Sequence, residues 1–167
     1  MTRTDMPQTL DERTTLLTFL DYARATALAK VEALDPADAG KAPLPGSPLM
    51  TLGGLISHLR WVEHWWFDVV LLGGEDRGPW TQDDPDGEMR IGAEVPIATL
   101  VAEYQEEIER HREQVAGLDL DTWAVGTVRS GTRVNLRWIL FHLVEEISRH
   151  NGHLDLLREI ADGTTGD

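Results

Sequence analysis

The chain has 167 residues, 41% of them hydrophobic, no cysteine, and a net charge of −14 from 15 basic and 29 acidic side chains. This charge opposes binding to nucleic acid, the lack of cysteine excludes disulfides, thiolate ligands and cysteine nucleophiles, and no apolar run is long enough to span a bilayer. We therefore expect one cytoplasmic domain over residues 1–167, with frayed termini at 1–8 and 163–167, and no nucleic-acid or membrane partner.

Hydrophobic periodicity predicts a first helix over residues 10–34. Its inward-facing stripe is Leu16, Leu20, Ala23, Ala27, Val31 and Leu34. A linker rich in Pro, Gly and Asp (35–48) cannot continue this helix. A second helix is predicted over 51–72, with Thr51 suited to cap it. Its Gly53–Gly54 pair lowers helix propensity but permits a close approach by another helix.

A polar segment, 73–92, is predicted as a long loop, and such loops are often functional or mobile. The third helix is expected to start near Pro96 and to end at about Val115. The connection 117–134 contains a Ser-Gly pair that predicts a turn between two short extended pieces. A fourth helix is predicted over 135–162. Four helices with long connections indicate an all-α four-helix bundle, in which side chains on facing helices can form a site.

The fourth helix carries three of the six histidines. At 3.6 residues per turn, His142, Glu146, His150 and His153 fall within about 80° of one another on one helix face. Grouping such side chains on an inward face is costly unless their desolvation is compensated, and a divalent metal ion would compensate it. The pattern therefore favours a metal centre inside the bundle.

A third ligand is expected from the second helix, where His58 lies on the apolar stripe. We predict His58, Glu146 and His150 as the metal ligands, a set that leaves at least one open coordination position, as catalytic sites do. His153, one turn beyond His150, is predicted to assist proton transfer in catalysis, and His142 flanks the same pair. Each of these two could instead be a fourth ligand or a hydrogen-bond partner.

Other interpretations fit the same residues. A Glu-x-x-x-His pair can be a solvated i, i+4 contact, and the histidines with Glu146 could form a buried hydrogen-bond network without metal. His64 and His111 are predicted to be exposed. The tryptophans of the helices are predicted to fill the core, whereas Trp80, on the polar segment, could close over a pocket.

Two motifs resemble a known family: SPLMTLGGLISHLRWVEHWWF (47–67) and VNLRWILFHLVEEISRHNGHLDLLREIADG (134–163). They are similar to those of the DinB-like superfamily of metal-binding four-helix bundles, in the branch of mycothiol-dependent enzymes and the mini-circle protein. The resemblance covers nearly the whole chain. It implies metal binding through a histidine of the second helix and two residues four apart on the fourth, which correspond to His58, Glu146 and His150.

The resemblance implies activation of a low-molecular-weight thiol by the metal. The expected function is a divalent-metal-dependent S-transferase that joins a mycothiol-like thiol to a small electrophile, with Zn²⁺ favoured over Ni²⁺, Fe²⁺ or Mn²⁺ as the ion. Related bundles are often dimers, so a homodimer stays open, and no cofactor-binding residues are assigned. The alternatives are a non-catalytic, stress-related metal- or ligand-binding protein and a metal-dependent hydrolase.

Overall fold

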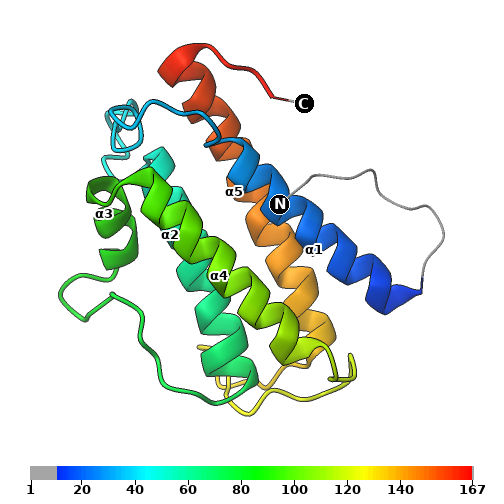
Figure 1. Cartoon of the computed structure of the whole chain (residues 1–167). Coiled ribbons are helices and arrows are strands. Elements are labelled where there is room, and N and C mark those ends of the chain that lie inside the picture. The colour runs from blue at the N-terminus through cyan, green and yellow to red at the C-terminus, as the bar shows by residue number, and fades with distance from the viewer. Residues whose placement is uncertain (1–10, 167) are drawn as a thin grey trace.

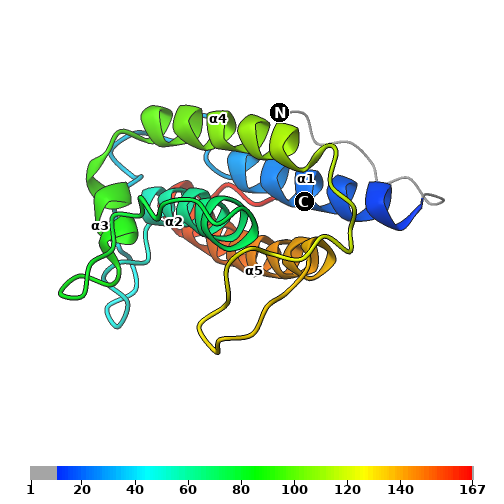
Figure 2. The same ribbon diagram turned by 90° about the horizontal axis from the view of Figure 1, so that it is seen from below.

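The computed structural model describes residues 11–166, and within that range it is helical without a β-strand. The predicted all-α four-helix bundle is confirmed. Its long helices are α1 (Glu12–Ala29), α2 (Leu52–His64), α4 (Ile97–Val115) and α5 (Leu136–Asp162), as Figure 1 shows. Helix α1 packs along α5, and α2 lies against both α4 and α5 (Figure 2). None of the helices in the described range could cross a membrane.

The predicted starts of these helices agree closely with the structure because their capping signals are local, but the prediction that the first helix continues to residue 34 is wrong, since α1 ends at Ala29. Asp11, Thr51 and Asn135 each accept a hydrogen bond from a backbone N–H in the first turn of α1, α2 and α5. Such side-chain caps satisfy amide groups that the helix itself leaves unpaired. Helix α5 ends at Gly163, whose φ of 79° lies in the left-handed region. The predicted frayed segment 1–8 lies outside the described residues.

The core is one apolar cluster shared by the four long helices. All six residues of the predicted inward stripe of the first helix are buried in it. Leu16, Leu20, Ala23 and Ala27 lie in α1, so periodicity at 3.6 residues identified its buried face, whereas Val31 and Leu34 pack from the residues that follow the helix. Below the helices in Figure 1, the connection 117–134 forms an irregular excursion. It carries a bridge between Trp123 and Asn135 and a turn in which Gly131 has a φ of 79°.

The prediction of a loop over all of 73–92 is wrong at its end, where α3 (Gly87–Glu94) forms. Helix α3 packs directly on the start of α2, and the backbones nearly touch there. A Cβ atom at Gly53 would lie 2.2 Å from the carbonyl oxygen of Gly92, and one at Gly54 would lie 3.0 Å from that of Met89. The glycine pair of α2 thus permits the close helix approach that the sequence suggested, with α3 as the neighbour.

The second predicted helix changes its hydrogen-bonding pattern before it ends. After α2, residues continue as a π-helix, η1 (Trp65–Leu71). A π-helical turn is wider than an α-helical turn and is frequent at functional positions. Here it precedes the segment 72–86, which leads to α3.

Candidate metal centre

Helix α5 supplies two of the three predicted ligands. Glu146 and His150 lie one turn apart on its half-buried face, and Nε2 of His150 is 3.2 Å from Oε1 of Glu146. Because α5 is a regular α-helix through this region, side chains at i and i+4 emerge side by side. The local geometry is therefore that of a chelating pair.

Helix α2 supplies the third group. His58 points from α2 toward α5, so that its Nε2 lies 3.5 Å from the same Oε1 of Glu146, and its ring centroid lies 4.9 Å from that of His150. One donor atom from each of His58, Glu146 and His150 lies within 4.8 Å of the other two. The structure thus brings together the three residues that the sequence singled out, from two different helices.

The spacing of these atoms fits a single divalent ion. Bonds of about 2.0–2.2 Å to nitrogen and carboxylate oxygen put two donors on one ion no more than about 4.4 Å apart. The observed separations need only small side-chain adjustments to meet that limit. The donor set of two imidazoles and one carboxylate suits Zn²⁺ and related divalent metals.

A fourth residue, Glu88 of α3, belongs to the site and was missed by the sequence analysis. Its Oε1 lies 3.1 Å from Nδ1 of His58, the ring nitrogen that faces away from Glu146. The Glu88 side chain is buried, and its Oε2 has no hydrogen-bond partner among the described residues. A carboxylate on the outer nitrogen of a ligating histidine fixes the tautomer and the ring orientation, as is usual at metal sites.

Hydrogen bonds shift the pKa values of His58 and Glu146 toward their charged forms, as expected for a protonated imidazole beside a carboxylate. Burial would lower the pKa of His58, but its hydrogen bonds to Glu146 and Glu88 outweigh burial and raise the pKa to about 9. Hydrogen bonds from His150 and His58 hold the pKa of Glu146 far below its ordinary value. In this state the proton on His58 supplies positive charge that an ion would otherwise supply.

The two flanking histidines of α5 have different surroundings. Nδ1 of His153 lies 3.2 Å from Nδ1 of His150, so His153 contacts the outer nitrogen of a predicted ligand. Burial and the charge of His150 lower the pKa of His153. His142 instead packs between Trp66 and Trp138, with ring centroids 4.6 and 5.2 Å away. His142 therefore lies outside the donor set.

A pocket of about 480 Å³ opens at His58. Val62, Trp65 and Trp66 form its helical wall, and Glu88 also lines it. Opposite, the segment 72–86 contributes Trp80 and Asp76, whose Oδ2 accepts a hydrogen bond of 2.8 Å from Nε1 of Trp80. The pocket thus combines an apolar indole surface with a few polar groups, as ligand sites commonly do.

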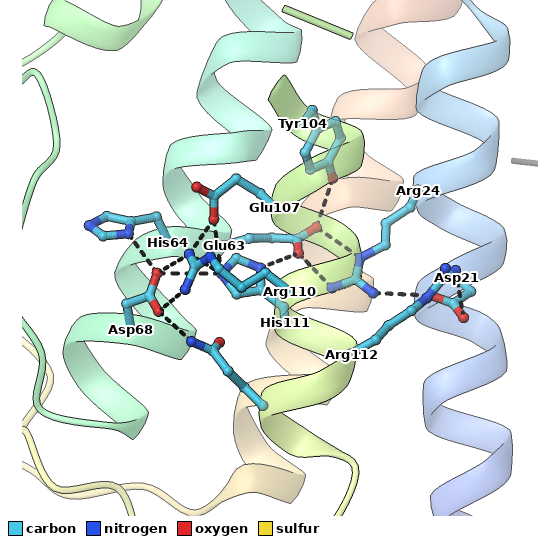
Figure 3. Close-up of polar contacts among 11 residues, drawn as sticks. Asp21, Arg24, Glu63, His64, Asp68, Tyr104, Glu107, Arg110, His111 and Arg112 are labelled. Carbon is cyan, nitrogen blue, oxygen red and sulfur yellow. Dashed lines mark hydrogen bonds and ion pairs between the residues drawn. The ribbon is translucent and has the colours of Figure 1, made fainter. Parts of the chain in front are cut away.

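The prediction that His64 and His111 are exposed is wrong. Both rings are buried, with 1% and 0% of their surface accessible. They belong to a polar network between α1, α2, η1 and α4 (Figure 3), in which Asp68 and Glu63 are the main acceptors. Their acidic partners Glu63 and Asp68 are themselves buried, so the polar residues around His64 belong to this network and not to the surface.

Asp68, Glu107 and His111 form a second cluster of donor atoms within 4.8 Å of one another. The guanidinium of Arg110 lies among them: it pairs with both carboxylates and approaches Nε2 of His111 at 3.2 Å. Because this cation already neutralises the acidic groups, we interpret the cluster as an ion-pair network of the bundle.

The fold and the site define a helical bundle with a candidate His₂-carboxylate metal centre beside a ligand-sized pocket. Comparison with known families identifies the particular group. The profile of the family described as Mycothiol-S-transferase matches residues 15–163, and the chain belongs to this family, within the DinB-like mycothiol-dependent branch. Its members are mycothiol-related thiol enzymes. No curated protein gives a significant match to the chain.

Solved structures support the same fold. The chain is similar to the crystal structure of a mycothiol-dependent maleylpyruvate isomerase, with a TM-score of 0.62 and 18% identity, and to a single-residue variant of that enzyme, with a TM-score of 0.62 and 17% identity. In both comparisons 84% of this chain is covered, and it spans 60% of the length of the other protein. At this identity the likeness concerns the fold alone.

Proposed function

We propose that this protein is a divalent-metal-dependent S-transferase that joins mycothiol, or a closely similar thiol, to a small electrophile. His58, Glu146 and His150 would hold the ion, with Zn²⁺ favoured. The observation that carries the proposal is the convergence of these side chains from α2 and α5, with His58 also lining the tryptophan-rich pocket. Membership of the mycothiol S-transferase family supports the choice of thiol.

A bound divalent cation would supply a Lewis acid that lowers the pKa of a thiol coordinated to it. The residues of this chain would prepare that chemistry. Glu88 holds the outer nitrogen of His58, which directs Nε2 toward Glu146 and His150. The indole rings of Trp65, Trp66 and Trp80 would shield the thiol and the electrophile from water.

The role of His153 stays a prediction. A His150 that binds the ion through Nε2 would donate its Nδ1 proton to Nδ1 of His153, so a neutral His153 would carry its own proton on Nε2 and could donate it in the predicted proton transfer. The same contact would orient His150, and His153 does not line the pocket beside His58. Replacing His153 by Asn, which keeps a polar group near the Nδ1 position, distinguishes the two roles: an orienting contact is kept, whereas proton transfer is lost.

Metal binding by defined variants tests the proposal. The purified protein is stripped with a chelator and titrated with Zn²⁺ by calorimetry, and S-transfer is then followed with mycothiol and a panel of electrophiles. We expect about one ion per chain in the wild type, and a loss of at least two orders of magnitude in affinity in His58→Ala and His150→Ala. His142→Ala is the matched control, because His142 is a half-exposed histidine of α5 outside the donor set.

Each outcome has a defined meaning. Failure of the wild type to bind any divalent ion would refute the metal centre. The His–Glu–His arrangement would then be a hydrogen-bond network that holds no metal. Binding that requires His58 and His150, without turnover of thiol and electrophile, would favour the non-catalytic binding protein. Turnover of a substrate without thiol would favour a hydrolase.

A further inference from the structure

One wall of the pocket beside the candidate metal centre is formed by a segment outside the helices. Asp76, Trp80, Thr81, Pro85 and Asp86 line it, and all five lie in the segment 72–86 between η1 and α3. The shape of the pocket therefore depends on how this segment is held against the bundle. Residues 72–77 of the segment are exposed, so burial contributes little to fixing that part.

One buried side chain reaches this segment from the helices. The backbone N–H of Arg77 donates a hydrogen bond of 3.1 Å to Nε2 of His64, the last residue of α2. Across residues 11–166, this is the hydrogen bond that joins residues 75–83 to the four long helices. The Arg77 side chain itself is exposed, so the contribution of this residue is its backbone amide.

The ring of His64 is fixed from its other side. Its Nδ1 lies 2.7 Å from Oδ2 of Asp68 in η1, and Asp68 in turn accepts hydrogen bonds from Arg110 and Gln114 of α4 (Figure 3). Because an amide N–H can only donate, Nε2 of His64 must accept, and the ring proton resides on Nδ1 and is donated to Asp68. The buried carboxylate thus selects the tautomer that can hold the backbone of Arg77.

Aromatic contacts connect His64, which holds the Arg77 amide, to the pocket wall. Trp61 packs edge-on against His64, with ring centroids 5.3 Å apart, and Trp80 packs against Trp61 at 6.3 Å. Within the segment, Asp76 accepts hydrogen bonds from the Gly78 backbone and from Nε1 of Trp80. Arg77 lies between these partners in the sequence, so its amide holds the turn that carries Asp76 and Trp80.

We propose that His64 is a positioning residue for the substrate pocket. Through the Asp68–His64–Arg77 hydrogen-bond chain, the polar network between α2, η1 and α4 holds the segment 72–86 so that Trp80 and Asp76 form the pocket wall. The inference rests on the proposed function only in naming this pocket as the place where thiol and electrophile bind.

The sharpest test removes the donor without touching the buried ring. Arg77→Pro deletes the amide N–H that His64 accepts, and Arg77→Ala is the control that keeps it. Hydrogen–deuterium exchange of residues 78–83 is measured by mass spectrometry on the folded, zinc-titrated proteins. We expect exchange in Arg77→Pro to be about two- to tenfold faster than in the control, the effect of losing one hydrogen bond, with unchanged zinc affinity.

A second pair of variants addresses the ring. His64→Gln places an amide oxygen near the position of Nε2 and can still accept from Arg77, whereas His64→Asn matches Nδ1 and reaches Asp68 only. We expect the exchange of residues 75–83 to stay near the wild-type rate in His64→Gln and to rise in His64→Asn. Where transfer activity is present, His64→Asn and Arg77→Pro should raise KM several-fold and leave kcat nearly unchanged.

Equal exchange in Arg77→Pro and Arg77→Ala would overturn the proposal, as would equal behaviour of the two His64 variants. Because exchange and zinc affinity are measured without turnover, these results stand even if no thiol is transferred. The failure of the positioning role and the failure of the proposed enzyme function are therefore distinguishable.

Discussion

At the scale of single residues, the site depends on side chains that face one another from separate elements. Helical periodicity predicted the histidines and the glutamate on one stripe of α5, and His58 on an apolar stripe of α2. It could do so because the position of a residue in the helical turn fixes the direction of its side chain. Glu88 could not be predicted in this way, because it lies on a short helix whose placement depends on packing against α2.

Glu88 gives the first residue-scale prediction. Glu88→Gln removes the negative charge that holds Nδ1 of His58 but preserves the shape of the side chain. We expect zinc affinity to fall about 10–100-fold, the usual effect of removing the hydrogen-bond partner of a ligating histidine. Isothermal titration with Zn²⁺ measures this directly.

The matched control for that prediction is Glu145→Gln. Glu145 is an exposed carboxylate beside Glu146 that pairs with Arg149 and does not contact His58. It tests whether the loss of any nearby negative charge weakens binding. If both variants bind zinc as tightly as the wild type, Glu88 has no role in holding the metal ligand.

At the scale of elements, the four long helices were predictable and two features were not. Helix α3 has the sequence GEMRIGAE, with two glycines in eight residues, so its intrinsic helix propensity is low. It forms beside Gly53 and Gly54 of α2, where the lack of side chains leaves room for its backbone. The π-helical turn of η1 was also missed, because a sequence of apolar residues such as WWFDVVL does not distinguish i+4 from i+5 hydrogen bonding.

The packing of α3 on α2 yields the element-scale prediction. Gly53→Ala would place a methyl group 2.2 Å from the Gly92 carbonyl oxygen, so the two backbones must separate. We expect a loss of about 1–3 kcal/mol in unfolding free energy, the usual cost of overpacking. Zinc affinity should fall as well, because α3 carries Glu88. Urea unfolding and zinc titration measure the two effects.

Gly152→Ala is the control for this substitution. Gly152 also lies in a long helix, but a Cβ atom there meets open space. Alanine at an exposed helical position stabilises a protein by roughly 0.5–1 kcal/mol relative to glycine. If Gly53→Ala is as stable as Gly152→Ala, the close approach of α3 is not required by the fold.

At the scale of the whole molecule, a buried ion pair joins three helices. The carboxylate of Glu63 in α2 accepts hydrogen bonds from Nε and a second guanidinium nitrogen of Arg24 in α1, at 3.0 and 2.5 Å. It also accepts a hydrogen bond of 2.7 Å from the hydroxyl of Tyr104 in α4 (Figure 3). His111 of α4 lies 3.3 Å from the same carboxylate. None of this was predicted, because the partners lie 39–48 positions apart and only the assembled bundle brings them together.

This network predicts how the stability of the bundle depends on pH. Burial alone would raise the pKa of Glu63, but Arg24 and His111 outweigh burial and hold the pKa at about 2, below the ordinary 4.5. A carboxyl whose pKa is lower in the folded than in the unfolded state stabilises the fold above pH 4.5. That contribution, of the order of 3 kcal/mol, is lost as the pH falls from 4.5 to 2.

Glu63→Gln tests the assignment of that acid-sensitive stability to one carboxyl. The variant removes the buried counter-charge of Arg24 and leaves it only the partly exposed Asp21, so we expect it to be about 3–5 kcal/mol less stable at pH 7. The difference from the wild type should shrink between pH 4.5 and 2, because only the wild type loses the Glu63 contribution there. Urea unfolding of the metal-free proteins across this range measures both curves, and the other carboxylates cancel in the difference. Parallel curves would contradict the lowered pKa of Glu63 and assign the acid sensitivity of the bundle to other groups.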